Sequence, residues 1–378
     1  MIQDRNLISR RGAVQTLAVG AAALAAASPR TFAAAAAPAA VPAGSGVNPG
    51  AHWEHWAKPQ DAGFKNDLSK VEEMLYPLPT TSMMVVRGGK VALSYGWVDQ
   101  VSYLASSRKS IMSMLYGKYV ANGTINTKTT MLELGIDDIV GLTPQEKQAT
   151  VQHLLMSSSG VYTPQGSPGG DQNTPKRGTY KPGEHFHYNN WDFNVVGAVF
   201  EKLTGKTVFK ALQEDLAGPL GWEDFDINRQ RMMGYEPPTS KYKAYHLFLS
   251  CRDMARAGLC MLNGGKWNGK EVVPAAWVRE STATHVVEAN KEHGYGYLWW
   301  LPSHGRPGPE WANSFKADGN YGQYIVVLPA LDLVVTHRRA VTDQFAIARN
   351  LGKTNAGPPG GGVDILKIVD QVVASLKA

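Results

Sequence analysis

The stretch that most constrains this chain runs from Leu104 to Tyr119. After its first turn, apolar residues recur at the spacing of one helix face, at Ile111, Leu115 and Tyr119. The run therefore predicts a helix with one buried side. Ser106 and Lys109 stand three residues apart at its beginning, so their side chains share a face and can meet.

This pair has a chemical meaning and a structural alternative. A serine hydroxyl is a poor nucleophile at neutral pH, and a lysine amine activates it when burial and the helix N-terminus lower the lysine pKa. Ser106 and Lys109 match the Ser-x-x-Lys pattern of hydrolases. Ser240 and Lys243 match it as well, without a helical run behind them. Ser106 can equally be a helix N-cap followed by a solvated lysine.

The first 37 residues have the composition of an export signal. Arg10 and Arg11 precede an alanine-rich apolar run, and small residues suited to cleavage follow at 33–37. The paired arginines favour the twin-arginine route, and the run is too short and too rich in alanine for a membrane-spanning helix. We expect cleavage within 33–37, a periplasmic or secreted bacterial protein, and no stable membrane insertion afterwards.

Charge and cysteine content argue against two further classes, nucleic-acid-binding proteins and secreted proteins stabilised by disulfides. The signal carries four arginines against one aspartate, so the formal charge of +6 falls to about +3 on its removal. That charge is too small and too scattered to indicate nucleic-acid binding. Cys251 and Cys260 lie roughly 13 Å apart along an expected helix that begins at Ser250, so they are not expected to form a disulfide.

The order of the remaining patterns predicts an α+β fold. Residues 38–59 are expected to be a linker or N-terminal extension, and residues 60–378 the main domain. Alternating runs at 83–95 and 324–337 predict a β-hairpin near each end of this domain. We therefore expect an antiparallel sheet flanked by N- and C-terminal helices.

Helical and loop signals fill the middle of the chain. A mostly helical lobe, at about 120–240, is expected as an insertion into the α/β part, with a long loop at 164–182. Helices are also expected at 60–75 and 363–376, and a strand at 294–300. The site would lie in the cleft between the two parts.

Two later segments carry further candidates. Tyr188 and Asn190 directly precede an expected helix: the phenol can relay a proton to a Ser/Lys pair, and the amide can bind the lysine or a substrate carbonyl. Gly319 and Asn320 precede an expected strand, where the Asn320 N–H can form an oxyanion hole with that of Ser106. The alternatives are a half-buried phenol and a strand-entry turn.

Other patterns are expected to have no catalytic role. Residues 264–270 imitate a phosphate-binding loop but are followed by Glu271 where Ser or Thr is required, so they predict a turn. The histidine pairs at 52–55 and 185–187 lack zinc-site spacing, and no metal or cofactor is expected. Trp191, Trp299 and Trp300 are expected in the core rather than in an acyl pocket.

Several segments, taken in order, resemble one known superfamily. They are Ala105–Ser110, Val151–Gly160, Pro182–Asn190, Gly218–Gly221, Ser250–Gly258, Asn263–Gly269 and Gly319–Gln323. From about residue 60 to the C-terminus the chain resembles the serine β-lactamase and penicillin-binding-protein superfamily. It is most similar to the β-lactamase-related branch, with family VIII esterases and 6-aminohexanoate-dimer hydrolases.

The resemblance implies a role for each candidate. Ser106 would be the acylated nucleophile, Lys109 its proton partner, and Tyr188 the base and later the acid. The N–H groups of Ser106 and Asn320 would bind the oxyanion, with Asn190 in the cleft. The reaction would be two-step acyl transfer to water on a small-molecule ester or amide, without metal or cofactor.

The chain departs from the superfamily pattern in two places. Penicillin-recognising members usually carry Lys-Thr-Gly or His-Thr-Gly at the third motif, where this chain has Ala-Asp-Gly319, with Lys316 one residue too early. Arg108 is polar where small or apolar residues are commoner. Asp318 would repel a carboxylate, so the sequence favours an esterase or linear-amide hydrolase.

Alternatives from other classes stay open. They are a β-lactamase or D,D-peptidase, and a non-catalytic homologue that binds a ligand or a peptidoglycan fragment. The sequence determines neither the physiological substrate nor the oligomeric state.

Overall fold

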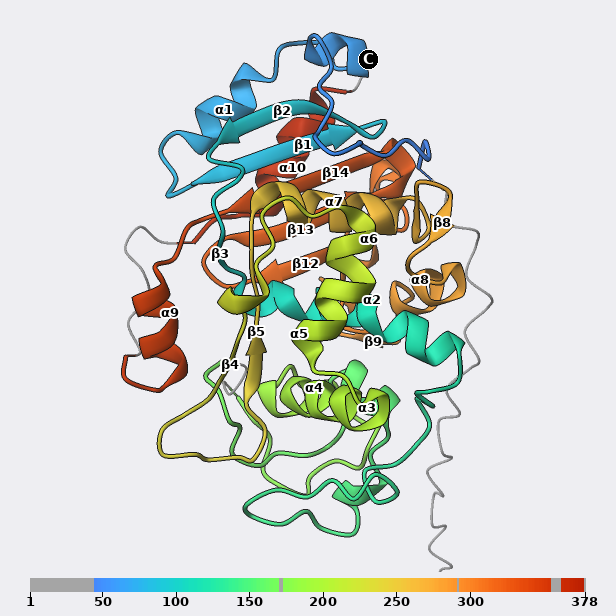
Figure 1. The fold of residues 1–378 in the computed structure, drawn as a ribbon, viewed down its shortest axis with the longest axis vertical. Helices are drawn as coiled ribbons and strands as arrows, with labels where there is room; N and C mark the ends of the chain where they lie inside the picture. Colours follow the sequence, from blue (N-terminus) through green and yellow to red (C-terminus); the bar gives the residue numbers. More distant parts are fainter. Residues whose placement is uncertain (1–43, 170–172, 291, 355–361, 377–378) are drawn as a thin grey trace, which may run out of the picture. The chain divides into compact units, whose positions relative to one another are not determined.

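The computed structural model describes residues 44–376, except 170–172, 291 and 355–361 (Figure 1). The predicted export signal and its cleavage region lie outside the described residues. The helices are α1 Ser69–Leu75, α2 Arg108–Ala121, α3 Val151–Leu155, α4 Asn190–Thr204, α5 Val208–Ala211, α6 Gly218–Leu220, α7 Cys251–Leu262, α8 Ala275–Ser281, α9 Asp343–Asn350 and α10 Ile365–Ala374. The short 3-10 turn η2, Ala105–Ser107, leads directly into α2.

One eight-stranded antiparallel sheet forms the centre of the fold, in the order β2-β1-β14-β13-β12-β11-β10-β9. Its strands are β1 Ser82–Arg87, β2 Lys90–Gly96, β9 Val286–Val287, β10 Gly294–Tyr295, β11 Trp300–Leu301, β12 Phe315–Gly319, β13 Gln323–Leu328 and β14 Leu333–Arg338. Three two-stranded pairs lie outside it: β3 Ser102–Tyr103 with β6 Phe248–Leu249, β4 Arg231–Met233 with β5 Ala244–His246, and β7 Lys266–Trp267 with β8 Lys270–Glu271. This confirms the predicted α+β class.

Both predicted hairpins are present. Strands β1 and β2 meet at Gly88 and Gly89, whose φ angles of 59° and 76° suit a two-residue turn that favours glycine. Strands β13 and β14 are joined by the turn Pro329–Leu331. The register pairs β1 with β14, so the two ends of the main domain close one continuous sheet (Figure 1).

The two faces of the sheet are covered by different helices, because successive strand residues point to opposite sides. On one face, Val85 and Val335 pack with residues of α1 and α10. On the other face, Val86 and Val334 pack with α7, which lies between the sheet and the helical part of the chain (Figure 1). The sheet is therefore flanked by N- and C-terminal helices, as predicted.

The helix predicted at 60–75 is broken. Only a 3-10 turn at Pro59–Ala62 and α1 are helical. Gly63 adopts a φ of 83°, and the Asn66 side chain accepts a hydrogen bond from the N–H of Leu68 at 3.0 Å. A side chain that bonds its own backbone in this way competes with the helix.

The strand predicted at 294–300 is also different. It is a tight hairpin of β10 and β11, with Leu298 at the turn in a left-handed conformation, φ 65°. The aromatic content of the segment comes from packing on both arms of the hairpin rather than from one long strand. In contrast, the imitation phosphate loop forms the predicted turn, between β7 and β8.

The helical part positions α2 against α4. The Tyr116 hydroxyl of α2 donates a hydrogen bond to the carbonyl of Val196 on α4 at 2.7 Å. On the opposite side, the Ser110 hydroxyl donates to the carbonyl of Leu298 at 2.7 Å. Helix α2 is thus held between the helical part and the sheet, with its N-terminal turn facing both.

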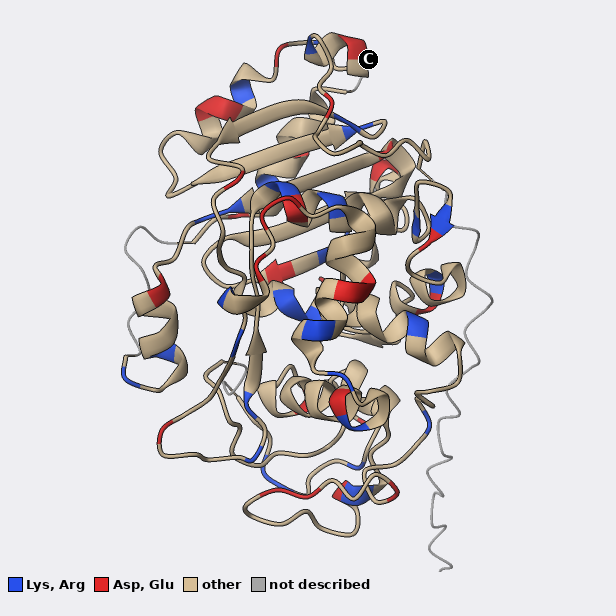
Figure 2. Cartoon of the chain, viewed as in Figure 1, with Lys and Arg blue, Asp and Glu red and all other residues tan. Residues whose placement is uncertain are grey.

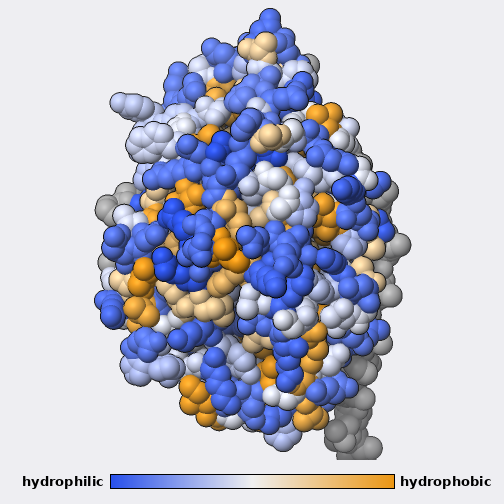
Figure 3. Space-filling view, viewed as in Figure 1, coloured by the Kyte–Doolittle hydropathy of each residue, from blue (hydrophilic) through white to orange (hydrophobic). Residues whose placement is uncertain are grey.

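In the view of Figure 3, apolar residues form small separated groups on a mainly hydrophilic surface. Within the described ranges, no helix has the length and apolar content needed to cross a membrane.

Candidate active site

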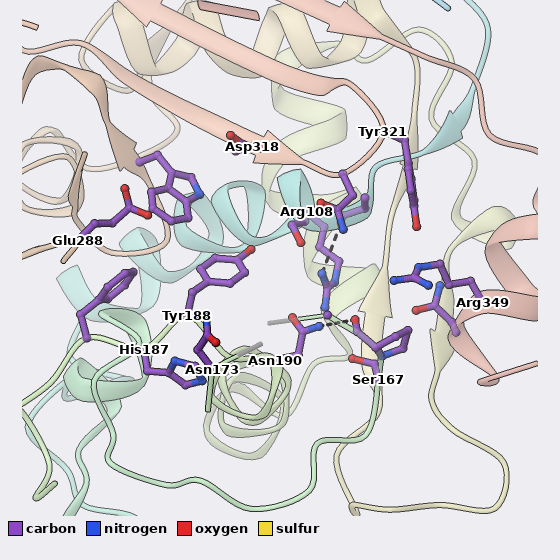
Figure 4. A pocket seen from close by; sticks show the side chains of 18 of the residues that line it. Arg108, Ser167, Asn173, His187, Tyr188, Asn190, Glu288, Asp318, Tyr321 and Arg349 are labelled. Carbon is purple, nitrogen blue, oxygen red and sulfur yellow. Dashed lines mark hydrogen bonds between the residues drawn. The ribbon is translucent and has the colours of Figure 1, made fainter. Parts of the chain in front are cut away.

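A cavity of about 750 Å³ lies where the start of α2, the end of β12 and the segment before α4 meet. Its walls include Ser106, Tyr188, Asn190 and Asn320. Figure 4 shows the side chains of Tyr188 and Arg108 lining this cavity, with Glu288 on one side and Arg349 on the other. The structure therefore brings most of the predicted site residues together around one space.

Ser106, Lys109 and Tyr188 are in mutual contact. The Lys109 Nζ lies 3.0 Å from the Ser106 Oγ and 2.6 Å from the Tyr188 hydroxyl oxygen, and forms hydrogen bonds with both. The same ammonium nitrogen is 4.3 Å from the ring centres of Tyr188 and Phe193. Lys109 is 2 % exposed, so it interacts with these groups rather than with water.

The environment shifts both proton-transfer groups toward their neutral forms. Burial, followed by the neighbouring charge of Arg108, holds the pKa of Lys109 well below its usual value. Burial also raises the pKa of Tyr188, against a smaller lowering by its hydrogen bond with Ser106. Both shifts favour the uncharged forms, an amine on Lys109 and a phenol on Tyr188.

Tyr188 is held in place by the serines that follow α3. The His187 N–H donates to the Ser157 carbonyl at 3.0 Å, and the Ser157 hydroxyl donates back to the His187 carbonyl at 2.8 Å. The Asn189 side chain caps α4 by accepting from the N–H of Asp192. Tyr188 therefore sits between a fixed turn and a fixed helix start.

Ser106 lies on a strained and closely packed turn. Ala105 before it has a left-handed φ of 48°, a conformation that L-residues rarely adopt. Gly319 at the end of β12 approaches this turn so closely that a methyl group there would lie 2.5 Å from the Leu104 carbonyl oxygen. The Ser107 hydroxyl also donates to the Gln323 carbonyl at 2.5 Å. Strand β12 and the Ser106 turn therefore pack closely together. Figure 2 shows basic residues at the start of α2 and an acidic residue at the end of β12.

Asn190 and Asn320 both border the cavity. The Asn190 Nδ2 donates to the Pro168 carbonyl at 2.7 Å, while its buried Oδ1 has no hydrogen-bond partner. Among the hydrogen bonds of the described residues, none joins Asn190 to Lys109. Asn320 lies in the turn between β12 and β13, next to the Ser106 turn. The predicted oxyanion role of the Ser106 and Asn320 N–H groups stays a prediction.

Lys316 does not supply a cation to this cavity. Its Nζ pairs with the Asp318 carboxylate at 2.7 Å, its side chain is 7 % exposed, and it borders a separate cavity with Glu292 and His293. Asp318 does border the main cavity, but its charge is already compensated by Lys316. The repulsion of carboxylates expected from Asp318 is therefore weakened.

Several residues that line the cavity were not predicted as site residues from the sequence. Arg108, His246 and Asn350 form part of its wall, although no motif pointed to the last two. Trp300 was expected in the core, but it lines the cavity and stacks on Tyr188 with ring centres 5.4 Å apart. One signal in the sequence could have indicated this position. Trp300 follows a hairpin turn and is next to the buried Trp299, so the two side chains point to opposite faces of the strand.

The competing patterns have structural roles. The Ser240 hydroxyl donates to the Asp138 carboxylate at 2.6 Å, while Lys243 pairs with Glu236, so the second Ser-x-x-Lys match does not form a pair. Cys251 and Cys260 are both buried and free. Trp191 is buried and donates to Asp138. In the part of the chain that the structure describes, no group of three or more His, Cys, Asp or Glu side chains could hold a metal ion.

Comparisons with known proteins agree with this arrangement. The family model described as Beta-lactamase matches residues 69–337. A 6-aminohexanoate-dimer hydrolase from Paenarthrobacter ureafaciens is 24 % identical over 304 residues, which is 71 % of this chain and 74 % of the relative.

Solved structures are similar in fold at lower identity. A Bacillus anthracis protein provisionally named 6-aminohexanoate-dimer hydrolase superposes with a TM-score of 0.60 at 17 % identity, over 88 % of this chain and 89 % of that one. A penicillin-binding protein homologue from Pyrococcus abyssi, solved as an octamer, gives 0.56 at 18 % identity, over 76 % of this chain and 78 % of the other. These similarities show the β-lactamase and transpeptidase-like fold.

Proposed function

This chain belongs to the Beta-lactamase family, and on that premise we propose that it is a serine hydrolase that cleaves an ester or a linear amide through an acyl-enzyme on Ser106. The observation that carries the proposal is the contact chain Ser106–Lys109–Tyr188 on the wall of a cavity large enough for a substrate. A nucleophile, a base within hydrogen-bond reach and a second proton carrier are the parts that acyl transfer needs.

In the acylation step, Lys109 accepts the proton of the Ser106 hydroxyl. Because its pKa is lowered, its free amine takes the Ser106 hydroxyl proton as Oγ attacks the substrate carbonyl. Because the pKa of Tyr188 is raised, the phenol is protonated at rest, so it is the better acid than base at this stage. Tyr188 gives its proton to the departing alcohol or amine and recovers one from Lys109.

Hydrolysis of the acyl-enzyme uses the same groups in reverse. A water molecule takes the place of the leaving group, loses its proton through Tyr188 to Lys109, and attacks the ester carbonyl on Ser106. Collapse of the tetrahedral intermediate returns a proton to the Ser106 Oγ and releases the carboxylic acid. The N–H groups of Ser106 and Asn320 stabilise the oxyanion in both steps.

The cavity wall favours an extended aliphatic substrate. Tyr188 and Trp300 stack, and Phe186 packs edge-on against Trp300 with ring centres 6.1 Å apart, so one side of the cavity is aromatic. Such a wall suits a methylene chain. The curated relative acts on 6-aminohexanoate dimer, which is a linear amide of this kind.

Three substrates test this function against its alternatives. We expect turnover of p-nitrophenyl butyrate, measurable turnover of 6-aminohexanoate dimer and slow turnover of nitrocefin, each lost in Ser106→Ala. Fast nitrocefin hydrolysis would instead identify a β-lactamase.

A serine-reactive fluorophosphonate separates an enzyme from a binding homologue. The folded wild-type protein should be labelled at Ser106 in one equivalent. A folded protein that stays unlabelled and inactive on all three substrates would favour the non-catalytic alternative, a protein that binds a ligand or peptidoglycan fragment.

A further inference from the structure

A buried positive charge without a counter-ion lies beside the nucleophile. Arg108 is 2 % exposed and borders the cavity, as do Ser106 and His246. Among the described residues, none of the ion pairs includes it. A guanidinium removed from water and not paired with an acid is costly, so this position calls for an anionic partner.

The hydrogen bonds of Arg108 leave much of its donor capacity unused. One terminal nitrogen lies 3.4 Å from the Ala105 carbonyl oxygen and the other 3.5 Å from the Asn194 Oδ1, both at the long limit. Its buried Nε has no partner. The guanidinium carbon lies 5.1 Å from the ring centre of Tyr245, which holds the plane of the group from one side.

His246 adds a second unsatisfied group to the same wall. It is 2 % exposed, and neither of its ring nitrogens has a partner within full hydrogen-bond geometry, although the Asn350 side chain approaches it closely enough to raise its pKa. Burial, then the charges of Arg108 and Lys109, hold its pKa well below the usual value, while Asn350 beside it acts weakly in the opposite direction. His246 is therefore a neutral imidazole that can donate one N–H.

The acidic groups of the cavity are already engaged. Asp318 pairs with Lys316 at 2.7 Å, and Glu288 pairs with His293 at 3.1 Å. Figure 4 shows Arg349 and Glu288 at opposite sides of the cavity, with Arg108 nearer Arg349. The side of the cavity that holds Arg108, His246 and Arg349 is thus cationic, and no described carboxylate compensates it.

We propose that Arg108 binds a carboxylate of the substrate, with the His246 N–H as a second donor and Arg349 at the rim. The proposal rests on the proposed function, since it places the reacting carbonyl at Ser106. A guanidinium can hold both oxygens of a carboxylate at once, which fixes the substrate's orientation as well as its charge. Arg108 would then supply the cation that the third motif lacks.

A pair of esters of equal chain length tests the assignment. Mono-p-nitrophenyl adipate carries a terminal carboxylate, and p-nitrophenyl hexanoate does not. We expect the wild-type enzyme to prefer the adipate ester, and Arg108→Met to reduce the adipate-to-hexanoate ratio of kcat/KM by about 10- to 100-fold. Arg108→Lys keeps the charge but loses the fork, so its ratio should be intermediate.

Two controls make the ratio interpretable. Removing Arg108 also removes a charge that lowers the Lys109 pKa, so both esters are compared at their pH-independent limiting rates. The acid limb of the dependence of kcat/KM on pH should move to higher pH in the variant. Arg279→Gln removes one exposed positive charge outside the cavity wall and should leave the ratio unchanged. A ratio within twofold of wild type in an active Arg108→Met would overturn the proposal.

A binding measurement on the wild-type protein covers the case in which Arg108→Met does not fold. Hexanoate should raise the melting temperature more than hexanamide at equal concentration, and inhibit p-nitrophenyl butyrate hydrolysis more strongly. Equal effects of the two compounds would contradict a carboxylate site. If the wild-type protein neither turns over the esters nor reacts with fluorophosphonate, the proposed function fails, while the binding comparison still decides on Arg108.

Discussion

Lys109 illustrates how single side chains determine the chemistry of this site. It has no carboxylate partner among the described residues, packs against two aromatic rings, and contacts both Ser106 and Tyr188. Burial, followed by the charge of Arg108, lowers the Lys109 pKa and so favours its free amine, whereas a lysine in solvent would lack this burial. Burial of Lys109 therefore supports the proposal that Ser106 is a nucleophile rather than an N-cap, which the Ser-x-x-Lys spacing alone does not do.

Removing the Tyr188 hydroxyl tests its proposed proton-transfer role. We expect Tyr188→Phe to lower the acylation rate by at least about 10²-fold, the scale of a positioned acid–base group. Pre-steady-state release of p-nitrophenol measures this step.

Tyr324→Phe is the matched control for that substitution. It removes a hydroxyl that donates to the Val363 carbonyl at 3.0 Å, away from the cavity wall. Its acylation rate should stay near wild type. A near-normal rate in Tyr188→Phe would mean that another group carries the proton.

At the scale of secondary-structure elements, β12 approaches the Ser106 turn closely, and the proposed oxyanion site depends on this approach. In Gly319→Ala, a methyl group would meet the Leu104 carbonyl oxygen at 2.5 Å and the Ser107 nitrogen at 2.9 Å. Backbone must then move, so we expect about 10²-fold slower acylation together with a loss of about 1–3 kcal/mol in unfolding free energy. Kinetics and chemical denaturation measure the two effects.

Gly50→Ala provides the comparison, because a methyl group there meets nothing within 4 Å. It should keep wild-type kinetics. Unchanged acylation in Gly319→Ala would show that β12 does not contribute to the oxyanion site.

The start of α4 depends on a buried carboxyl. Asp192 accepts hydrogen bonds from the Ser159 hydroxyl at 2.5 Å and from the Ser159 N–H at 3.3 Å, and burial raises its pKa to about 8. Since the carboxyl is neutral when folded and ionised when unfolded between about pH 4 and 8, its contribution to stability falls as the pH rises through that window. The slope is at most about 1.4 kcal/mol per pH unit.

Asp192→Asn should remove this slope, because its side chain is neutral at every pH. Denaturant unfolding at a series of pH values measures it, and the data near pH 4, where both side chains are uncharged, serve as the internal control. The variant should gain stability relative to wild type between pH 4 and 8. If the unfolding free energies of wild type and Asp192→Asn changed in parallel with pH, Asp192 would ionise normally in the folded protein.

The sequence predicted the elements whose pattern is local. The hairpins around Gly88 and Pro329 and the closing helix α10 follow from alternation, turn residues and helical spacing. The break before α1 was missed because Asn66 bonds its own backbone, which apolar spacing does not reveal. Helix α9 was not predicted either, since it is short and has few buried residues.

The candidate site was predictable only in part for a similar reason. Ser106, Lys109 and Tyr188 belong to recognisable motifs, whereas His246 and Asn350 reach the cavity through tertiary packing alone. Trp300 was expected in the core because residue type alone does not distinguish it from its buried neighbour Trp299. The burial of Arg108 could not be predicted either, because it depends on how the sheet and α4 pack around α2.

At the scale of the whole molecule, the site is assembled from three distant segments. Ser106 comes from the start of α2, Tyr188 from the segment before α4, and Asn320 from the turn after β12. The sheet brings the first and third together, and the hydrogen bond between Tyr116 and Val196 keeps the second in place. Activity should therefore be lost in one cooperative transition with the fold.

We also propose that the chain is exported and processed before it acts. The export signal at 1–37 predicts a mature N-terminus between residues 34 and 38, and N-terminal mass mapping of protein from a bacterial periplasm or medium measures it. Arg10→Lys with Arg11→Lys should reduce export if the twin-arginine route is used. An intact N-terminus in exported protein would contradict processing.

The proposed function depends on acylation of Ser106 by the substrate. Mass spectrometry of protein quenched with acid during turnover of p-nitrophenyl butyrate tests it most directly. We expect one butyryl group on the peptide that contains Ser106, and none in Ser106→Ala. Hydrolysis that persists in Ser106→Ala, or a butyryl group on another residue, would contradict it.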